Sequence, residues 1–83
     1  MANVILYTTT WCPYCIRAKR LLNKKEIAYT DINVSKGDAR AKMVALTNGT
    51  TVPQILINDQ PIGGCDELFA LDRSGKLDKL LHH

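Results

Sequence analysis

The chain has 83 residues, of which 46% are hydrophobic and 23% charged, and its formal net charge at pH 7 is +3. This length fits one small domain with a compact core, and the balance of apolar and charged residues is that of a folded globular protein rather than a disordered or fibrous one. Apolar runs such as Val4 to Tyr7 are far shorter than the roughly 20 residues of a membrane-spanning helix.

The charge and the cysteine content limit the kinds of partner and the cellular compartment that we expect for this protein. Residues 1–10 lack the basic start and apolar stretch of a signal peptide, and three cysteines, an odd number, suit a reducing compartment better than a disulfide-stapled secreted protein. We therefore expect a cytoplasmic location without membrane contact. No helix-turn-helix or zinc-finger pattern accompanies the basic residues, so we expect no nucleic-acid partner.

The first half of the chain predicts a parallel strand–helix–strand unit. Val4 to Tyr7 is a short apolar run typical of a central strand buried on both faces. Pro13 to about Lys24 has apolar residues at helical spacing and predicts an amphipathic helix. Ile27 to Ile32 is rich in β-branched and aromatic residues and predicts a second strand. Strand, helix and strand in this order imply a right-handed crossover.

The second half predicts a helix, a hairpin and a closing helical region. A helix is expected from about Asp38 to Leu46, with Gly49 as its C-cap. Gln54 to Ile57 predicts a third strand, and the turn-forming Asn58-Asp59 returns the chain antiparallel along Gln60 to Gly63. Pro61 places that fourth strand at an edge of the sheet. A third helix then ends by Ser74-Gly75, and a short apolar segment, Leu77 to Leu81, closes the chain.

The chemistry centres on Cys12-Pro13-Tyr14-Cys15, between the first strand and the first helix. A helix N-terminus offers unpaired N–H groups and the positive end of the helix dipole, which favour the thiolate of Cys12. Pro13 suits the first helical position because its fixed φ is helical and its missing N–H would have no partner. Cys15, one turn along, can reach the same sulfur. The spacing predicts a redox-active dithiol.

Several features of this region stay open on the residues alone. The C-x-x-C could be half of a zinc site, although such a site needs four ligands at suitable spacing, or a structural disulfide, which stabilises little when its loop is so short. Trp11 could shape a substrate surface or cover the edge of the core. The basic residues of the first helix could be a solvated face, or a field that attracts anionic thiol substrates and favours the Cys12 thiolate; they are Arg17, Lys19, Arg20, Lys24 and Lys25.

Three motifs together resemble one family. Cys12-Pro13-Tyr14-Cys15, Thr51-Val52-Pro53-Gln54 and Gly63-Gly64-Cys65-Asp66 occur in the order and at the spacing typical of glutaredoxins, especially the short bacterial dithiol type. The resemblance covers residues 3–81. It implies an α/β thioredoxin fold, with a four-stranded mixed sheet and helices on both faces, and one domain over residues 1–83. His82-His83 is expected to be a remnant of an expression tag.

The resemblance also implies the site. Cys12 and Cys15 would be catalytic, and Val52-Pro53 would be a cis peptide bond. Glutathione would be held by backbone pairing to Val52, by the helix N-terminus at Cys65 and Asp66, and by the Asp66 carboxylate. Many family members have a lysine where this chain has Thr9, and Arg40 is the expected substitute. The glutathione-binding residues implied are Tyr14, Arg40, Thr51, Val52, Pro53, Gly64, Cys65 and Asp66. Cys65 itself is expected to be a small, partly buried residue, with a regulatory or oxidised thiol as the alternative.

The function implied is glutathione-dependent reduction of protein disulfides and protein–glutathione mixed disulfides. Glutathione would serve as the reducing co-substrate, with no metal and no tightly bound cofactor. The partners implied are glutathione and glutathionylated or disulfide-containing proteins, with ribonucleotide reductase as one candidate, and the chain would act as a monomer. The alternative is a carrier in which Cys12 of two subunits and two glutathiones hold a [2Fe–2S] cluster, a role usually paired with a single active-site cysteine.

Overall fold

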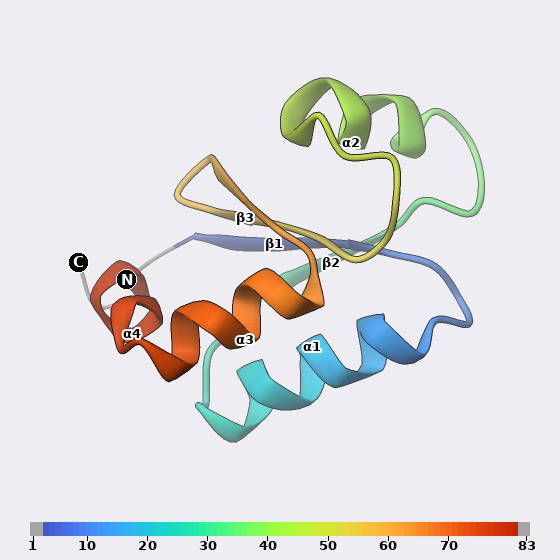
Figure 1. Ribbon diagram of the computed structural model, residues 1–83. Helices are drawn as coiled ribbons and strands as arrows, with labels where there is room; N and C mark the ends of the chain where they lie inside the picture. The colour runs from blue at the N-terminus through green and yellow to red at the C-terminus, as the bar shows by residue number, and fades with distance from the viewer. Residues whose placement is uncertain (1–2, 82–83) are drawn as a thin grey trace.

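The computed structural model describes residues 3–81 and shows four strands and four helices (Figure 1). His82 and His83, the expected tag remnant, lie outside the described residues. The elements in chain order are β1 (Val4–Thr8), α1 (Pro13–Lys24), β2 (Thr30–Asn33), α2 (Ala39–Thr47), β3 (Gln54–Ile57), β4 (Gln60–Gly63), α3 (Cys65–Arg73) and α4 (Lys76–Leu81).

The strands form one mixed sheet in the order β2-β1-β3-β4. β1 pairs in parallel with β2 and antiparallel with β3, so that Leu6 lies between Asp31 and Ile55. β3 pairs antiparallel with β4 across a turn in which Asn58 and Asp59 both have positive φ. The central position of β1, the parallel crossover and the edge position of Pro61 are therefore confirmed.

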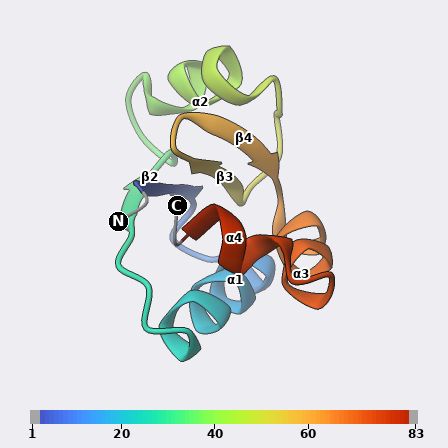
Figure 2. The same cartoon turned by 90° about the vertical axis from the view of Figure 1, so that its left-hand side faces the viewer.

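Helices cover both faces of the sheet. α1, α3 and α4 lie on one face and α2 on the other, as the two views in Figures 1 and 2 agree. Alternating residues of β1 and β3 supply two cores, because successive side chains of a strand point to opposite faces. Leu6 and Ile55 pack with the three-helix side, whereas Tyr7 and Leu56 pack with Met43 of α2. The predicted thioredoxin-type architecture is confirmed. No helix among residues 3–81 has the length and apolar character to span a membrane.

The second strand begins later than the sequence pattern predicts. The prediction was Ile27 to Ile32, but the strand runs from Thr30 to Asn33. The preceding residues instead end α1: Glu26 has a φ of 58°, and the Ile27 N–H donates to the Leu22 carbonyl at 2.9 Å. Ile27 and Tyr29 still pack against the core. Their apolar, β-branched and aromatic character therefore reflects packing rather than strand pairing.

The cap of α2 is also corrected. The left-handed residue that ends the helix is Asn48, with a φ of 60°, and its N–H donates to the Val44 carbonyl at 2.8 Å. Asparagine tolerates this conformation better than other side-chain-bearing residues. Gly49, the predicted cap, is small for another reason. A Cβ at Gly49 would overlap the side chain of Gln54.

This cap predicts opposite effects for two substitutions. Asn48→Ala should lower the free energy of unfolding by about 1 kcal/mol, because alanine is disfavoured in the left-handed region. Asn48→Gly should leave it unchanged or slightly higher, since glycine has no such penalty. Urea unfolding of both variants beside the wild type measures the difference. Equal stability of the alanine and glycine variants would show that the cap contributes nothing.

Candidate functional site

The dithiol lies where β1 runs into α1. Cys12 has an extended backbone and is the N-cap of α1, and its sulfur accepts a hydrogen bond from the Cys15 N–H at 3.2 Å. Pro13 occupies the first helical position. Both placements follow the sequence prediction. An N–H group of the first turn thus points at the Cys12 sulfur, the direction in which a helix N-terminus stabilises negative charge.

Cys12 also contacts a segment distant in sequence. Its thiol is directed at the Val52 carbonyl oxygen, 3.9 Å away, and the residue is 8% exposed. The Val52-Pro53 peptide bond is cis, as expected from the Thr51-Val52-Pro53 motif. The nucleophile candidate therefore lies between the start of α1 and the loop that leads into β3.

Cys15 is in a different environment from Cys12. It is 1% exposed, and burial, followed by the hydrogen bond to Cys12, raises the pKa of its thiol to about 12. Because the raised pKa favours the neutral form, Cys15 stays a thiol at neutral pH. All three cysteines are free. The dithiol thus has one sulfur, that of Cys12, in contact with the loop before β3, and a second, less exposed sulfur that stays protonated.

This asymmetry predicts the order of alkylation. Iodoacetamide at pH 7 to 8 should modify Cys12, while Cys15 and Cys65 react only after unfolding, because both are less exposed than Cys12 and burial raises the pKa of each thiol. Peptide mapping by mass spectrometry after brief labelling, in native buffer and in urea, measures the order. Rapid native labelling of Cys15 at a rate matching Cys12 would contradict the structure.

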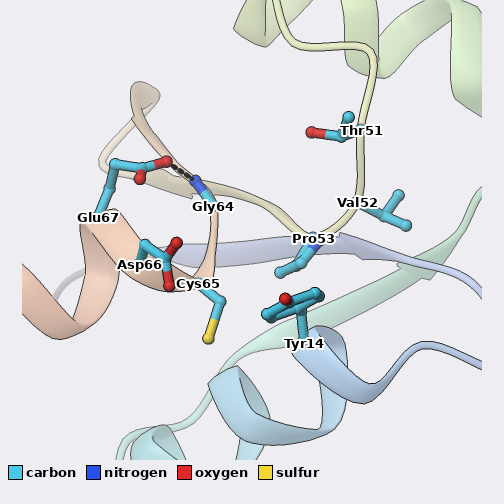
Figure 3. Close-up of a pocket in the computed structure, with 8 residues that line it drawn as sticks. All are labelled: Tyr14, Thr51, Val52, Pro53, Gly64, Cys65, Asp66 and Glu67. Atoms are coloured by element: carbon cyan, nitrogen blue, oxygen red, sulfur yellow. Dashed lines mark hydrogen bonds between the residues drawn. The ribbon is translucent and has the colours of Figure 1, made fainter.

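A cavity of about 330 Å³ adjoins the dithiol. Three segments meet around it: the first turn of α1, the loop before β3, and the junction of β4 and α3 (Figure 3). Cys12 does not line the cavity. Its sulfur lies against the carbonyl of Val52, and Val52 is one of the lining residues. The lining contains every predicted glutathione-binding residue except Arg40, together with one further residue; it consists of Tyr14, Thr51, Val52, Pro53, Gly64, Cys65, Asp66 and Glu67.

Because Gly64 has no side chain, the β4–α3 junction and the loop before β3 can approach each other closely. A Cβ on Gly64 would lie 3.2 Å from the Pro53 carbonyl oxygen, closer than side chains normally pack. Gly64 is the N-cap of α3, so Cys65 and Asp66 are its first two helical residues. Their N–H groups have no intrahelical partner. The cavity therefore combines free backbone donors with the exposed carboxylate of Asp66.

Glu67 is the lining residue that the sequence prediction missed. Its carboxylate accepts a hydrogen bond from the Gly64 N–H at 2.8 Å, drawn as the dashed line in Figure 3. Gly63, with a φ of 111°, leaves room for the Glu67 side chain. The detectable signal was a glutamate three residues after an N-cap, the spacing of a capping box. Glu67 holds the β4–α3 junction in the shape that presents Cys65 and Asp66.

Arg40 lies outside the lining of the cavity. Its guanidinium Nη1 donates to the Thr50 carbonyl at 3.0 Å, one residue before Thr51. Thr9, which replaces the family lysine, hydrogen-bonds within its own loop, from Oγ1 to the Trp11 carbonyl at 3.4 Å. Arg40 is thus held next to the cavity without lining it, and its role in binding glutathione stays a prediction.

Two open features of the sequence are resolved by exposure. Trp11 is 80% exposed, so it does not cover the edge of the core. Cys65 is 4% exposed, and burial raises the pKa of its thiol, which fits the expected small buried residue. In residues 3–81, no three His, Cys, Asp or Glu side chains are grouped so as to hold a metal ion.

Comparison with known proteins gives one consistent result. The family model described as Glutaredoxin matches residues 4–62. A glutaredoxin of Pseudomonas aeruginosa is 51% identical over 82 residues, which cover 98% of each chain. The solution structure of a glutaredoxin from Brucella melitensis is 46% identical, with a TM-score of 0.84 and coverage of 98% of this chain and 89% of that one. The crystal structure of a buckwheat glutaredoxin–glutathione complex is 30% identical, with a TM-score of 0.88 and coverage of 98% and 77%.

Fold, dithiol placement and sequence similarity over nearly the full chain all agree. The chain therefore belongs to the glutaredoxin family of glutathione-dependent thiol–disulfide oxidoreductases.

Proposed function

We propose that this chain reduces protein–glutathione mixed disulfides and protein disulfides through Cys12 and Cys15, with glutathione as the reducing co-substrate. The observation that carries the proposal is the position of Cys12. Its sulfur accepts a hydrogen bond from the Cys15 N–H at the start of α1 and lies against Val52, which lines a cavity together with the other predicted glutathione-binding residues except Arg40. A known complex of buckwheat glutaredoxin with glutathione supports the choice of ligand.

The cavity offers complementary groups for glutathione. The Val52 backbone would pair with the cysteinyl part of the tripeptide in the manner of an added strand. The free N–H groups of Cys65 and Asp66 would bind the γ-glutamyl carboxylate, and the Asp66 carboxylate its ammonium. Tyr14 would form one wall beside the sulfur. Arg40, held at Thr50, is the proposed partner of the glycyl carboxylate.

Thiolate formation would itself prepare Val52 for the ligand. In the dithiol form, the Cys12 thiol is directed at the Val52 carbonyl oxygen. The thiolate has no proton to donate, so that carbonyl becomes available to the backbone N–H of glutathione. The Cys15 N–H continues to stabilise the sulfur in either state.

In the monothiol route, the Cys12 thiolate attacks the glutathionyl sulfur of a mixed disulfide. The bond to the protein sulfur breaks, the protein thiolate leaves and takes a proton, and glutathione remains on Cys12. The thiolate of a second glutathione then attacks the bound glutathionyl sulfur. This step forms oxidised glutathione and regenerates the Cys12 thiolate.

In the dithiol route, Cys12 attacks a protein disulfide and forms a mixed disulfide with one of its sulfurs. Cys15 loses its proton and attacks Cys12, which frees the substrate and closes a Cys12–Cys15 disulfide. The pKa of about 12 in the reduced form keeps Cys15 from competing as a nucleophile before that step. Two glutathiones reduce the disulfide, at a potential of about −200 to −230 mV.

The remaining proposals concern context. We propose a single glutaredoxin domain that works as a monomer on glutathionylated or disulfide-containing proteins, with ribonucleotide reductase as a candidate substrate. The proposed compartment is the cytoplasm, where the glutathione pool is reducing. Within residues 3–81, no feature favours iron–sulfur cluster carriage over thiol exchange.

The test is turnover of a glutathionylated peptide with glutathione, glutathione reductase and NADPH, followed as NADPH consumption. We expect turnover that depends on both the protein and glutathione. A protein that instead accepts electrons from thioredoxin reductase, and shows no glutathione-dependent turnover, would keep the fold assignment and overturn the glutathione assignment.

A further inference from the structure

A second hollow, which we call the basic groove, lies between α1 and α3. Its volume is about 270 Å³, and its lining residues are Arg17, Arg20, Leu21, Lys24 and Phe69. The Arg17 guanidinium lies over the Phe69 ring, 5.3 Å from its centroid, a cation–π contact that holds the arginine at the groove. Three cations and two apolar side chains therefore share one small concave surface.

The three cations of the basic groove have no anionic partner within residues 3–81. The ion pairs of this part of the chain use other lysines: Lys19 with Asp31, Lys25 with Asp72 and Asp78, and Lys42 with Asp38. The first turn of α1 contains no acidic residue. The groove therefore presents a local excess of positive charge.

The arrangement of these cations differs from that of an ordinary solvated face. Arg17, Arg20 and Lys24 are spaced three and four residues apart, so they lie on one side of α1. Their charges border a hollow that also exposes apolar surface to a ligand. A helix face that is only solvated by water would not need to be concave. Carboxylate side chains joined by a polypeptide backbone match both features.

The distance from the dithiol sets where those carboxylates would lie. Arg17 is five residues after Cys12, or about 8 Å along the helix, and Lys24 is twelve residues after it, or about 18 Å. An extended chain advances about 3.3 Å per residue. Acidic residues about two to six positions from the substrate cysteine of the disulfide would therefore reach the groove.

We propose that the basic groove docks an acidic segment of the protein substrate, flanking the cysteine whose disulfide bond Cys12 breaks. This inference rests on the proposed function and adds a substrate class to it. Opposite charges raise the rate of productive encounter and fix the orientation of the incoming chain, and both effects weaken as salt screens them. The groove would thus select protein substrates without contacting glutathione.

The test compares two glutathionylated peptides that differ only in having Glu or Lys at the positions two to six residues from the cysteine. For the wild type, kcat/KM should favour the Glu peptide by about tenfold at low ionic strength, the order expected for electrostatic steering. The preference should shrink towards one in 0.5 M salt. A wild type with no preference, or with a preference that salt does not change, would overturn the proposal.

Matched variants locate the effect. Arg20→Glu/Lys24→Glu should abolish or reverse the peptide preference, whereas Lys76→Glu/Lys79→Glu, the same charge change on exposed residues of α4, should retain most of it. Equal peptide preferences in the two double variants would assign the selectivity to net charge alone and would overturn the proposal that the groove docks the peptide.

Two further measurements separate this inference from the proposed function. Turnover of a small glutathione mixed disulfide by the wild type tests the proposed function without any peptide charge. Binding of an acidic peptide that lacks cysteine, followed by NMR, tests the groove without chemistry. Amide shifts concentrated at residues 17–24 and Phe69 would support docking there, and shifts confined to other surfaces would refute it.

Discussion

Cys12→Ser should lower the turnover of a glutathionylated peptide more than about a thousandfold, since loss of a catalytic nucleophile typically has effects of this size or larger. The reason is that only Cys12 combines a helix N-cap position with contact to the Val52 edge of the cavity. A serine hydroxyl cannot form the mixed disulfide. The glutathione-coupled assay measures the loss, and Cys65→Ser is the matched control, because only the backbone N–H of Cys65 takes part in the proposed binding of glutathione, and serine retains it.

Cys15→Ser separates the two proposed routes. It should turn over the glutathionylated peptide at a rate within a few-fold of the wild type, because the monothiol route needs only Cys12. It should lose reduction of an intramolecular protein disulfide, because no resolving thiol remains. Measuring both substrates with both variants decides the assignment. Substantial peptide turnover by Cys12→Ser, or full disulfide reduction by Cys15→Ser, would refute the division of roles.

Asp66→Asn should raise the KM for glutathione about tenfold or more, because a hydrogen bond to a charged group contributes about 1.5–3 kcal/mol and 1.4 kcal/mol is a factor of ten. Asp66 is an exposed lining residue at the second helical position of α3, and the substitution removes its charge with little change of shape. Steady-state kinetics with varied glutathione give the constant.

Asp59→Asn is the control for this experiment. It makes the same chemical change in the β3–β4 turn, outside the lining of the cavity, and asparagine tolerates the positive φ of that position. Thermal unfolding of both variants should stay close to the wild type, since the helix-dipole contribution of Asp66 is about 0.3–1 kcal/mol. An unchanged KM in Asp66→Asn would show that the ammonium of glutathione binds elsewhere.

Local features were predictable because short-range physics decides them. The continuous apolar run of β1 indicated a strand covered on both faces, and both cores do lie against it. Pro13 after Cys12 indicated the first helical position. The hydrogen bond from the Cys15 N–H to the Cys12 sulfur follows from that geometry alone. Asn58-Asp59 indicated the hairpin turn for the same reason.

Errors arose where one residue type serves two purposes. Ile27 and Tyr29 have strand-like character, but both pack on the core before the strand begins, and the Ile27 N–H bonds back to α1. Gly49 resembled a cap, yet the left-handed residue is Asn48, and Gly49 instead lies against the end of the Gln54 side chain. The first distinction depends on packing against residues distant in the sequence, and the second on which of two adjacent residues adopts the left-handed conformation.

The strands, their order and the position of the dithiol follow from local patterns, because strand alternation, helix caps and turn residues act within a few positions. Which surfaces those elements share follows instead from their packing. Packing three separate segments together made the cavity beside Cys12, buried Cys15 enough to raise its pKa to about 12, and kept Arg40 out of the lining. It also joined the cations of α1 to Phe69 of α3 in the basic groove. These properties depend on burial and on contacts between distant residues, which no local pattern specifies.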